Sequence, residues 1–321
     1  MSEPQPPAAV EPVPHGRTAR RVDWLLLPPV LRRTIEDRLG APVVTADSAG
    51  AGYTPGFASV LTATNGDRMF VKAASTKAQR PFADAYREEI RKLRRLPDGL
   101  PVPRLLWSHE DELWVVLGLE YVDGRNPARP WDPAELDTCL DTLELLADAL
   151  TPAPASLGLQ PLSGDDGFGA MVSSWDYVRR YLPDWPHLED AAALAARQAE
   201  VLVGDTLVHT DARDDNFLLA PAGAVLCDWN WPVHGPAWVD TVLLLISASG
   251  DGLDADAVLA ARRLTRDVDP DHVDVLLALV CGYFLQMRDQ PVPNSSPYVR
   301  VHQDWYAQAA WAWLARRRGW S

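Results

Sequence analysis

The sequence is poor in cysteine and contains no long uninterrupted apolar run. Its 3 cysteines, Cys139, Cys227 and Cys281, are far apart, whereas zinc sites and disulfide frameworks need closely spaced or even-numbered sets. Isolated thiols are typical of a reducing compartment, so we expect a cytoplasmic protein. The longest apolar stretch, residues 273–287, contains Asp274 and is shorter than the ~18 residues that span a bilayer. The sequence therefore predicts no membrane segment.

Positive charge is also scarce. The chain has 30 lysine and arginine residues against 44 aspartate and glutamate residues, which gives a net charge of -14. The average surface field would repel nucleic acids and anionic membranes, so we expect neither as a partner. A cationic substrate would be attracted, although an acidic surface that only keeps the protein soluble explains the charge equally well.

The length of the chain and its prolines indicate how it is divided. At 321 residues it suits one catalytic unit of two unequal lobes. Residues 1–20 are rich in proline and lack both periodic apolar positions and a secretory signal, so we expect a disordered tail there. We place an N-terminal, nucleotide-binding lobe at residues 21–119, a hinge at 120–124 and a C-terminal catalytic and substrate-binding lobe at 125–321.

The N-terminal lobe has the pattern of a small antiparallel sheet. Runs of β-favouring residues alternate with turn signals between residues 41 and 74, and Asn65-Gly66 is a strong hairpin marker. Three antiparallel strands are predicted there. The same criteria predict helices at 22–39 and 82–96 and further strands at 105–108 and 113–119. The lobe should therefore be a five-stranded sheet that carries one main helix.

Beyond the hinge the sequence turns to long segments rich in alanine and leucine. Their apolar spacing predicts helices at 133–149, 188–203, 237–249, 255–267 and 271–287, and a further one around 305–313. A strand-rich lobe followed by a helical lobe defines an α+β protein with a cleft at the connector. We therefore look for the functional site in that cleft.

The most informative segment is residues 207–231. Its two apolar runs, FLLA and AVLC, are joined by a short turn and predict an antiparallel hairpin. Asn216 and Asp228 are equally distant in sequence from Ala222, so we expect them to face each other at the open end of this hairpin. Amide and carboxylate oxygens are suitable ligands for Mg²⁺, which keeps other positions for water and phosphates. A plain loop between two buried strands is the structural alternative.

Asp211 precedes Asn216 by five positions and follows His209, which gives the pattern H-x-D-x-x-x-x-N of a kinase catalytic loop. In that loop Asp211 would orient a substrate hydroxyl and accept its proton. Phosphoryl transfer needs in-line placement and neutralised charge more than a strong nucleophile, so a carboxylate suffices. We expect His209 to brace the loop.

A second set of candidates lies in the N-terminal lobe. Lys72 is placed inside an apolar β-run, which is unusual for a lysine without a partner. Glu89 on the following helix is the expected partner, and the pair would hold the ammonium toward nucleotide phosphates. A surface lysine on a solvated face is the alternative, and the neighbouring Glu88 competes with Glu89 as the partner.

Glycines cluster in residues 48–59, between two predicted strands. Gly52 lies in the middle of this segment, where a glycine lets backbone N–H groups approach phosphates. The segment matches neither G-x-G-x-x-G nor the Walker pattern, so a plain hairpin loop explains it as well.

Taken in order, these residues resemble the aminoglycoside phosphotransferase and choline kinase group of protein-kinase-like enzymes. The resemblance extends from about residue 42 to about 250 and is strongest at 209–240. It implies a bilobal protein-kinase-like fold, Asp211 as catalytic base, and Asn216 and Asp228 as metal ligands.

The resemblance also implies roles for residues outside that loop. Asp240, in a segment similar to the family's G-D-P-x-x-D, would brace the catalytic loop. LEYVDGR is similar to the family's hinge, where backbone groups near Glu120 and Val122 would meet the adenine edge. The loop departs from the family pattern, since Thr210 replaces a glycine, Arg213 replaces a histidine and Asp214-Asp215 replace the common Pro-Gly. Arg213 could pair with a phosphate or with a neighbouring carboxylate.

The expected function is an ATP- or GTP-dependent O-phosphotransferase that uses Mg²⁺ and acts on a hydroxyl of a small molecule. The acceptors considered are an aminoglycoside or other cationic natural product, a sugar, an amino alcohol and a biosynthetic intermediate. A nucleotide-binding pseudokinase or interaction module without transfer activity is the alternative. Neither the oligomeric state nor the choice between ATP and GTP follows from the sequence.

Overall fold

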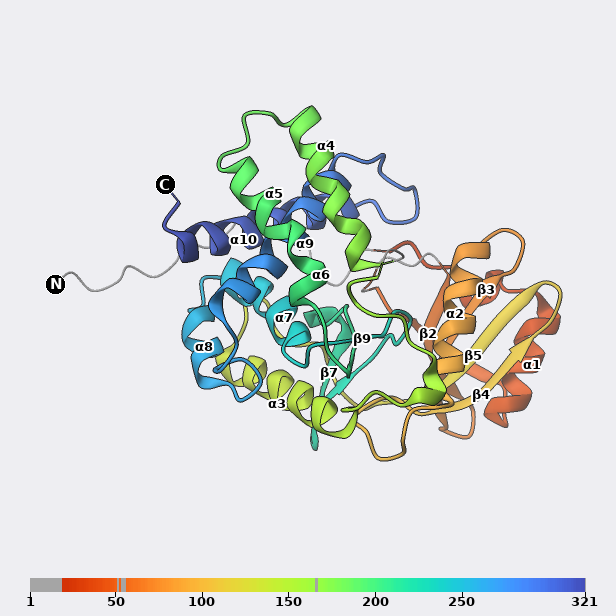
Figure 1. Ribbon diagram of the computed structural model, residues 1–321. Helices are drawn as coiled ribbons and strands as arrows, with labels where there is room; N and C mark the ends of the chain where they lie inside the picture. The colour runs from red at the N-terminus through yellow and green to blue at the C-terminus, as the bar shows by residue number, and fades with distance from the viewer. Residues whose placement is uncertain (1–18, 51, 53–55, 165–166, 321) are drawn as a thin grey trace.

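The computed structural model describes residues 19–50, 52, 56–164 and 167–320. It has two lobes, which lie side by side in Figure 1. The smaller contains a five-stranded antiparallel sheet in the order β1-β2-β3-β5-β4. Its strands are β1 (Val43–Ser48), β2 (Phe57–Ala63), β3 (Arg68–Ser75), β4 (Leu105–Glu110) and β5 (Trp114–Glu120). The five predicted strands are all confirmed, and the predicted tail at 1–20 lies almost entirely outside the described residues.

The two faces of this sheet are covered by different helices. On β5, Val115, Leu117 and Leu119 pack with the apolar side of α2 (Arg80–Leu93). Val116, between them, points to the opposite face, which α1 (Pro29–Leu39) covers. This alternation follows from the two-residue period of a strand. It also places Lys72 on the α2 side, because Val71 and Ala73 belong to the core beneath α1.

Local sequence accounts for where several helices begin and end. Helix α1 starts at Pro29, a residue favoured in a first turn, and stops at Gly40, whose φ of 86° is readily adopted only by glycine. Helix α3 (Pro133–Ala149) starts after Asp132, whose carboxylate accepts hydrogen bonds from the backbone N–H groups of Ala134 and Glu135. For the first helix, the predicted start at residue 22 was too early, because α1 begins only at Pro29.

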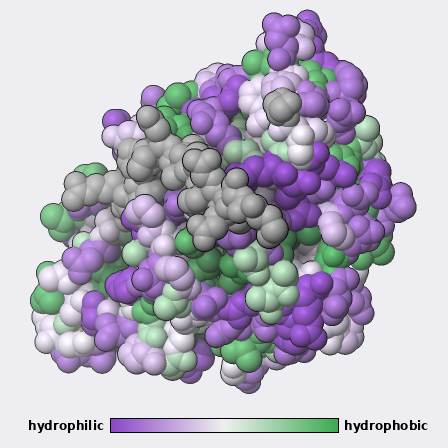
Figure 2. Space-filling model, turned by 90° about the vertical axis from the view of Figure 1, so that its left-hand side faces the viewer, coloured by the Kyte–Doolittle hydropathy of each residue, from purple (hydrophilic) through white to green (hydrophobic). Residues whose placement is uncertain are grey.

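The larger lobe is mainly helical and has one contiguous apolar core. Its remaining helices are α4 (Ser174–Tyr181), α5 (Leu188–Ala196), α6 (Gln198–Val201), α7 (Val239–Gly250), α8 (Ala255–Ala261), α9 (Pro270–Arg288) and α10 (Val299–Arg318). Figure 2 shows the face on the left of Figure 1, near α8 and α10, where hydrophilic residues surround smaller apolar areas. In the part of the chain that the structure describes, no helix is both long and apolar enough to cross a membrane.

Short strands of the larger lobe lie next to the cleft. Strands β7 (Phe217–Ala220) and β8 (Gly223–Leu226) form the predicted hairpin, and β6 (Thr206–Val208) pairs with β9 (Val233–Gly235). In Figure 1 these strands lie between the helices of the larger lobe and the sheet of the smaller lobe. The segment that carries Asp211, Asn216 and Asp228 is thus brought to the cleft.

Candidate active site

Lys72 and Glu89 form a buried ion pair in the smaller lobe. The Lys72 side chain projects from β3 toward α2, and its Nζ donates to Oε1 and Oε2 of Glu89 at 2.8 and 2.9 Å. Glu88 pairs instead with Arg91 on the same helix, at 2.8 Å. The structure therefore places Glu89, and not Glu88, on Lys72.

The same lysine also reaches across the cleft to the larger lobe. Lys72 Nζ donates to Oδ1 of Asp228 at 2.7 Å, and the Nδ2 group of Asn230 donates to the same oxygen at 2.8 Å. The backbone of Asp228 has a φ of 69°, a conformation that few residues other than glycine adopt. Backbone strain of this kind is common where a side chain must be aimed at a ligand.

One ammonium group thus contacts two carboxylates. Burial and these ion pairs together shift the pKa values of Lys72, Glu89 and Asp228. Burial lowers the pKa of Lys72, but Asp228 and Glu89 outweigh it and hold the pKa above its usual value. Burial raises the pKa of Glu89 to about 7. For Asp228, burial is outweighed by the charge of Lys72, which lowers the pKa to about 2. Asp228 is therefore the carboxylate that stays ionised, and this cluster has room for more positive charge.

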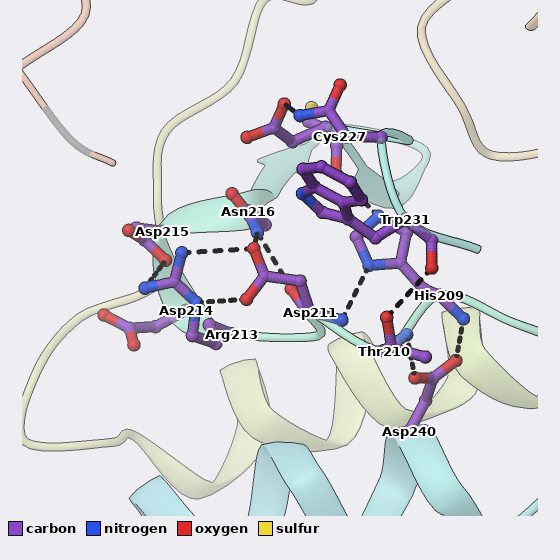
Figure 3. A network of polar contacts seen from close by, with 12 residues as sticks. His209, Thr210, Asp211, Arg213, Asp214, Asp215, Asn216, Cys227, Trp231 and Asp240 are labelled. Carbon is purple, nitrogen blue, oxygen red and sulfur yellow. Dashed lines mark hydrogen bonds and ion pairs between the residues drawn. The ribbon is translucent and has the colours of Figure 1, made fainter. Parts of the chain in front are cut away.

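Asp240 braces the candidate catalytic loop, residues 209–216, as predicted. One carboxylate oxygen of Asp240 accepts the backbone N–H of His209 at 2.6 Å, and the other accepts that of Thr210 at 2.8 Å (Figure 3). Thr210 has a φ of 68°, which is strained for a β-branched residue. The two hydrogen bonds from Asp240 hold this turn in place.

His209 ties the loop to the strand that precedes Asp228. Its Nε2 lies 3.0 Å from the carbonyl oxygen of Cys227, and its Nδ1 accepts the backbone N–H of Asp211 at 3.3 Å. His209 is only 2% exposed and stacks edge-on against Trp229. These contacts fit the bracing role predicted for His209.

Asp211 is held by two neighbours in its own loop. Asn216 Nδ2 donates to Oδ2 of Asp211 at 3.0 Å, and Arg213 Nε donates to Oδ1 at 2.6 Å (Figure 3). The same guanidinium lies 3.3 Å from Oδ1 of Asp215. Of the two partners that the sequence suggested for Arg213, the structure shows the neighbouring carboxylate.

The hairpin register corrects one sequence prediction. Phe217 pairs with Leu226, so the next pair joins Asn216 to Cys227, whose N–H donates to the Asn216 carbonyl at 2.8 Å. Asp228 lies one position beyond, because the centre of the turn falls between Pro221 and Ala222 and not on Ala222. Asn216 and Asp228 therefore do not face each other directly, although they line the same cavity.

That cavity, of about 450 Å³, lies between the lobes and brings most of the predicted binding residues together. Its lining includes the metal-ligand candidates and the nucleotide-binding candidates Lys72, Gly52, Glu120 and Val122, whereas Glu89 lies behind Lys72. Gly52 has a φ of 84°. The lining matches a nucleotide in kind, with apolar residues such as Val60 and Leu119 beside charged ones.

The residues present fit a divalent cation. The Nδ2 group of Asn216 is used by Asp211, and Figure 3 shows its amide oxygen pointing away from that carboxylate. Asp228 has one oxygen engaged by Lys72, and its side chain is 30% exposed. No group of three or more acidic, histidine or cysteine side chains that could hold a metal occurs among the described residues. A site with two protein ligands suits Mg²⁺, which takes its other ligands from water and phosphates.

A second cavity, of about 470 Å³, lies on the other side of the catalytic loop. Asp211 and Arg213 belong to its lining, as does Trp231, whose side chain is 60% exposed. Trp231 was not predicted from the sequence as a functional residue. Its position three residues after Asp228 was the available signal, because tryptophan is enriched at interfaces where one end of the side chain is apolar and the other is wet.

Comparisons with known proteins identify the family and the fold of the chain. The model of the phosphotransferase enzyme family matches residues 56–271, which is more than half of the chain. No curated protein sequence matches this chain. Among solved structures, a choline/ethanolamine kinase family protein from Mesorhizobium loti has a TM-score of 0.55 and 16% identity, over 91% of this chain and 92% of that one.

Two further structures are similar over most of their length. A macrolide 2'-phosphotransferase type I has a TM-score of 0.53 and 15% identity, over 90% of this chain and 98% of that one. A putative fructosamine-3-kinase from Haemophilus somnus has a TM-score of 0.53 and 12% identity, over 87% and 96%. At such identities the likeness shows the protein-kinase-like fold alone. With the family match, it follows that the chain belongs to the phosphotransferase enzyme family.

Proposed function

We propose that the protein transfers a phosphoryl group from ATP or GTP, with Mg²⁺, to a hydroxyl group of a small molecule. The observation that carries the proposal is the position of the catalytic loop between two cavities. Asp211 lines the second cavity, while Asn216, hydrogen-bonded to it, lines the cavity that contains Lys72 and Asp228. A donor on one side and an acceptor on the other would meet at Asp211.

Each residue has a defined part in this proposal. Asp211 orients the acceptor hydroxyl and takes its proton as the new P–O bond forms, while the bond from the γ-phosphorus to the β,γ-bridging oxygen breaks and the nucleoside diphosphate leaves. Lys72, held by Glu89, binds the nucleotide phosphates, and backbone groups near Glu120 and Val122 meet the base. Bound Mg²⁺, held by Asn216 and Asp228, would supply positive charge to the phosphates.

Gly52 completes the set, since its backbone can approach phosphates closely. We retain residues 21–119 and 125–321 as the two functional lobes, with 120–124 as the hinge. The cytoplasm remains the proposed location, because the three cysteines are unpaired.

A mass-shift screen tests this function. Purified protein is incubated with Mg²⁺ and either ATP or GTP, together with a library of metabolites and antibiotics, and products are analysed by mass spectrometry. We expect at least one hydroxyl compound to gain one phosphoryl group. If Mg-nucleotide binds tightly in calorimetry but no compound is phosphorylated, the alternative of a nucleotide-binding module without transfer replaces the proposal.

A further inference from the structure

The second cavity has walls that are mainly apolar. Residues from five segments of the larger lobe contribute apolar or aromatic side chains, among them Phe168, Trp231, Leu243, Tyr283, Phe284 and Tyr306. Phe284 and Tyr306 stack with their ring centroids 5.4 Å apart, which gives one wall a continuous aromatic surface. Such a wall favours a ligand that can give up water from a large apolar area.

The charged side chains in the described lining of this cavity already have partners. Among the described lining residues, Asp211 and Arg213 are the only acidic or basic side chains of the Asp, Glu, Lys and Arg types. They are bound to each other, with Arg213 Nε 2.6 Å from Asp211 Oδ1. A polycation entering the cavity would lose its hydration without meeting an unpaired carboxylate among the described lining residues, and that desolvation is costly.

Apart from Asp211, the acidic residues of the larger lobe that the structure describes are not in the lining of this cavity. Glu189 is bound by Arg179 at 2.8 Å, and Asp190 lies 3.5 Å from His187. Neither of these residues, nor Asp184, is part of the lining. Asp165 and Asp166 lie outside the described residues.

Trp231 is the second observation that indicates the kind of acceptor. Its indole is 60% exposed, although it borders an apolar cavity, and its backbone carbonyl accepts a hydrogen bond from Thr210 Oγ1 at 3.1 Å. Figure 3 draws Trp231 in the same group of residues as Asp211. An exposed indole that lines the same cavity as the Asp211 carboxylate is suited to cover one face of a ring.

We infer that the acceptor is a neutral, ring-bearing hydroxyl compound whose ring lies against Trp231 and whose hydroxyl reaches Asp211, and not a polycationic amino sugar. The inference rests on the proposed function for the identity of the acceptor cavity. It runs against the attraction that a net charge of -14 would exert on cations. The lining of the cavity determines which acceptor binds, because the average surface charge affects the rate at which a ligand meets the protein more than its fit inside a cavity.

Ligand binding without turnover gives the most direct test. Saturation-transfer NMR is recorded on the full chain at low ionic strength, with naphthyl β-glucoside as the neutral probe and a 2-deoxystreptamine aminoglycoside as the polycation. We expect saturation of the naphthyl protons in the wild-type protein. The dissociation constant of the neutral probe should be about tenfold higher in Trp231→Ala and unchanged in Tyr181→Ala. Tyr181 is the control because it is 57% exposed and belongs to neither cavity.

Two results would overturn the inference. The first is that the naphthyl protons show no saturation, or that Trp231→Ala does not change it. The second is that the aminoglycoside binds more tightly than the neutral probe. Calorimetry with Mg-ATP on the same samples separates this from the proposed function. Loss of nucleotide binding would count against the phosphotransferase site, whereas intact nucleotide binding with no Trp231-dependent probe binding would count against the acceptor class alone.

Discussion

Lys72 Nζ lies 2.7 Å from Oδ1 of Asp228, although the two residues are 156 positions apart in the chain. This contact joins the sheet of the smaller lobe to the hairpin of the larger one. The same ammonium is bound by Glu89, so this side chain is one of the links between the two lobes at the cleft. Substitutions around Lys72 should therefore affect both stability and nucleotide binding.

Removing the charge of Lys72 should destabilise the protein. In Lys72→Met, Glu89 and Asp228 lose their shared cation inside the cleft, and leaving a buried charge unpaired costs about 3–5 kcal/mol. We expect the free energy of unfolding, measured by urea denaturation, to fall by about that amount. The double variant Lys72→Met/Glu89→Leu should recover part of it.

Lys77→Met is the control, because Lys77 is an exposed lysine five residues away. It should change the free energy of unfolding by less than about 0.5 kcal/mol. Equal stability of Lys72→Met and Lys77→Met would show that the buried ion pairs of Lys72 contribute nothing to the fold.

Arg213 should affect turnover more than nucleotide binding. Its guanidinium holds Asp211 and lies 3.3 Å from Asp215, so Arg213→Ala would release the catalytic carboxylate from its fixed orientation. Misplacement of a reacting group commonly lowers rate by about 10-fold to 100-fold. We expect kcat to fall in that range while the KM for ATP changes little, with Arg213→Lys intermediate. Unchanged kcat in Arg213→Ala, relative to the exposed-site control Arg33→Ala, would refute this role.

Asp240 should be required for the shape of the catalytic loop. In Asp240→Asn one carboxylate oxygen becomes an NH₂ group, which cannot accept a hydrogen bond. One of the two backbone N–H groups, of His209 or of Thr210, therefore loses its acceptor. A buried N–H left without an acceptor costs about 1–3 kcal/mol. Thermal unfolding should show a lower Tm and turnover should fall. The surface variant Asp267→Asn, at a side chain that is 87% exposed, should show neither effect.

Asp215 should make stability depend on pH in one direction. Burial raises the pKa of Asp215 to about 6, although Arg213 acts against this shift. A raised pKa means that the folded state favours the protonated form. The contribution of Asp215 to stability is therefore present below its unfolded pKa of about 3.9 and is lost as pH rises through about 6.

Comparison with Asp215→Asn isolates this effect, because asparagine does not titrate. The wild-type protein should lose about 2 kcal/mol relative to the variant between pH 4 and pH 7, judged from urea unfolding of the nucleotide-free proteins. A difference that stays constant over this interval, or that changes in the opposite direction, would contradict the raised pKa.

Local pattern predicted the elements of the fold well, but tertiary contacts determined several helix ends. The segment 255–267 was predicted as one helix, yet α8 ends at Ala261. The next residue, Arg262, is drawn to α3, where it pairs with Asp137 and Asp141 at 2.8 and 2.5 Å. Contacts between residues more than a hundred positions apart leave no trace in the spacing of apolar residues.

The candidate site was predictable to a similar degree. The H-x-D-x-x-x-x-N spacing identified Asp211 and Asn216, and an isolated lysine in an apolar strand identified Lys72. The register of the hairpin was missed by one position, because the centre of a turn depends on which residues take up the turn geometry. The acceptor cavity was missed as a set, since its walls come from residues between Gly167 and Tyr306 that only folding brings together.

The most direct test of the account is the Mg²⁺ dependence of ATP binding, measured by calorimetry on the wild-type protein, Asp228→Asn and the control Asp267→Asn. If Asp228 and Asn216 hold the cation, Mg²⁺ should tighten ATP binding by about tenfold or more in the wild-type protein and in the control. The enhancement should disappear in Asp228→Asn. The same Mg²⁺ enhancement in Asp228→Asn as in the wild-type protein would contradict the proposed phosphotransferase site.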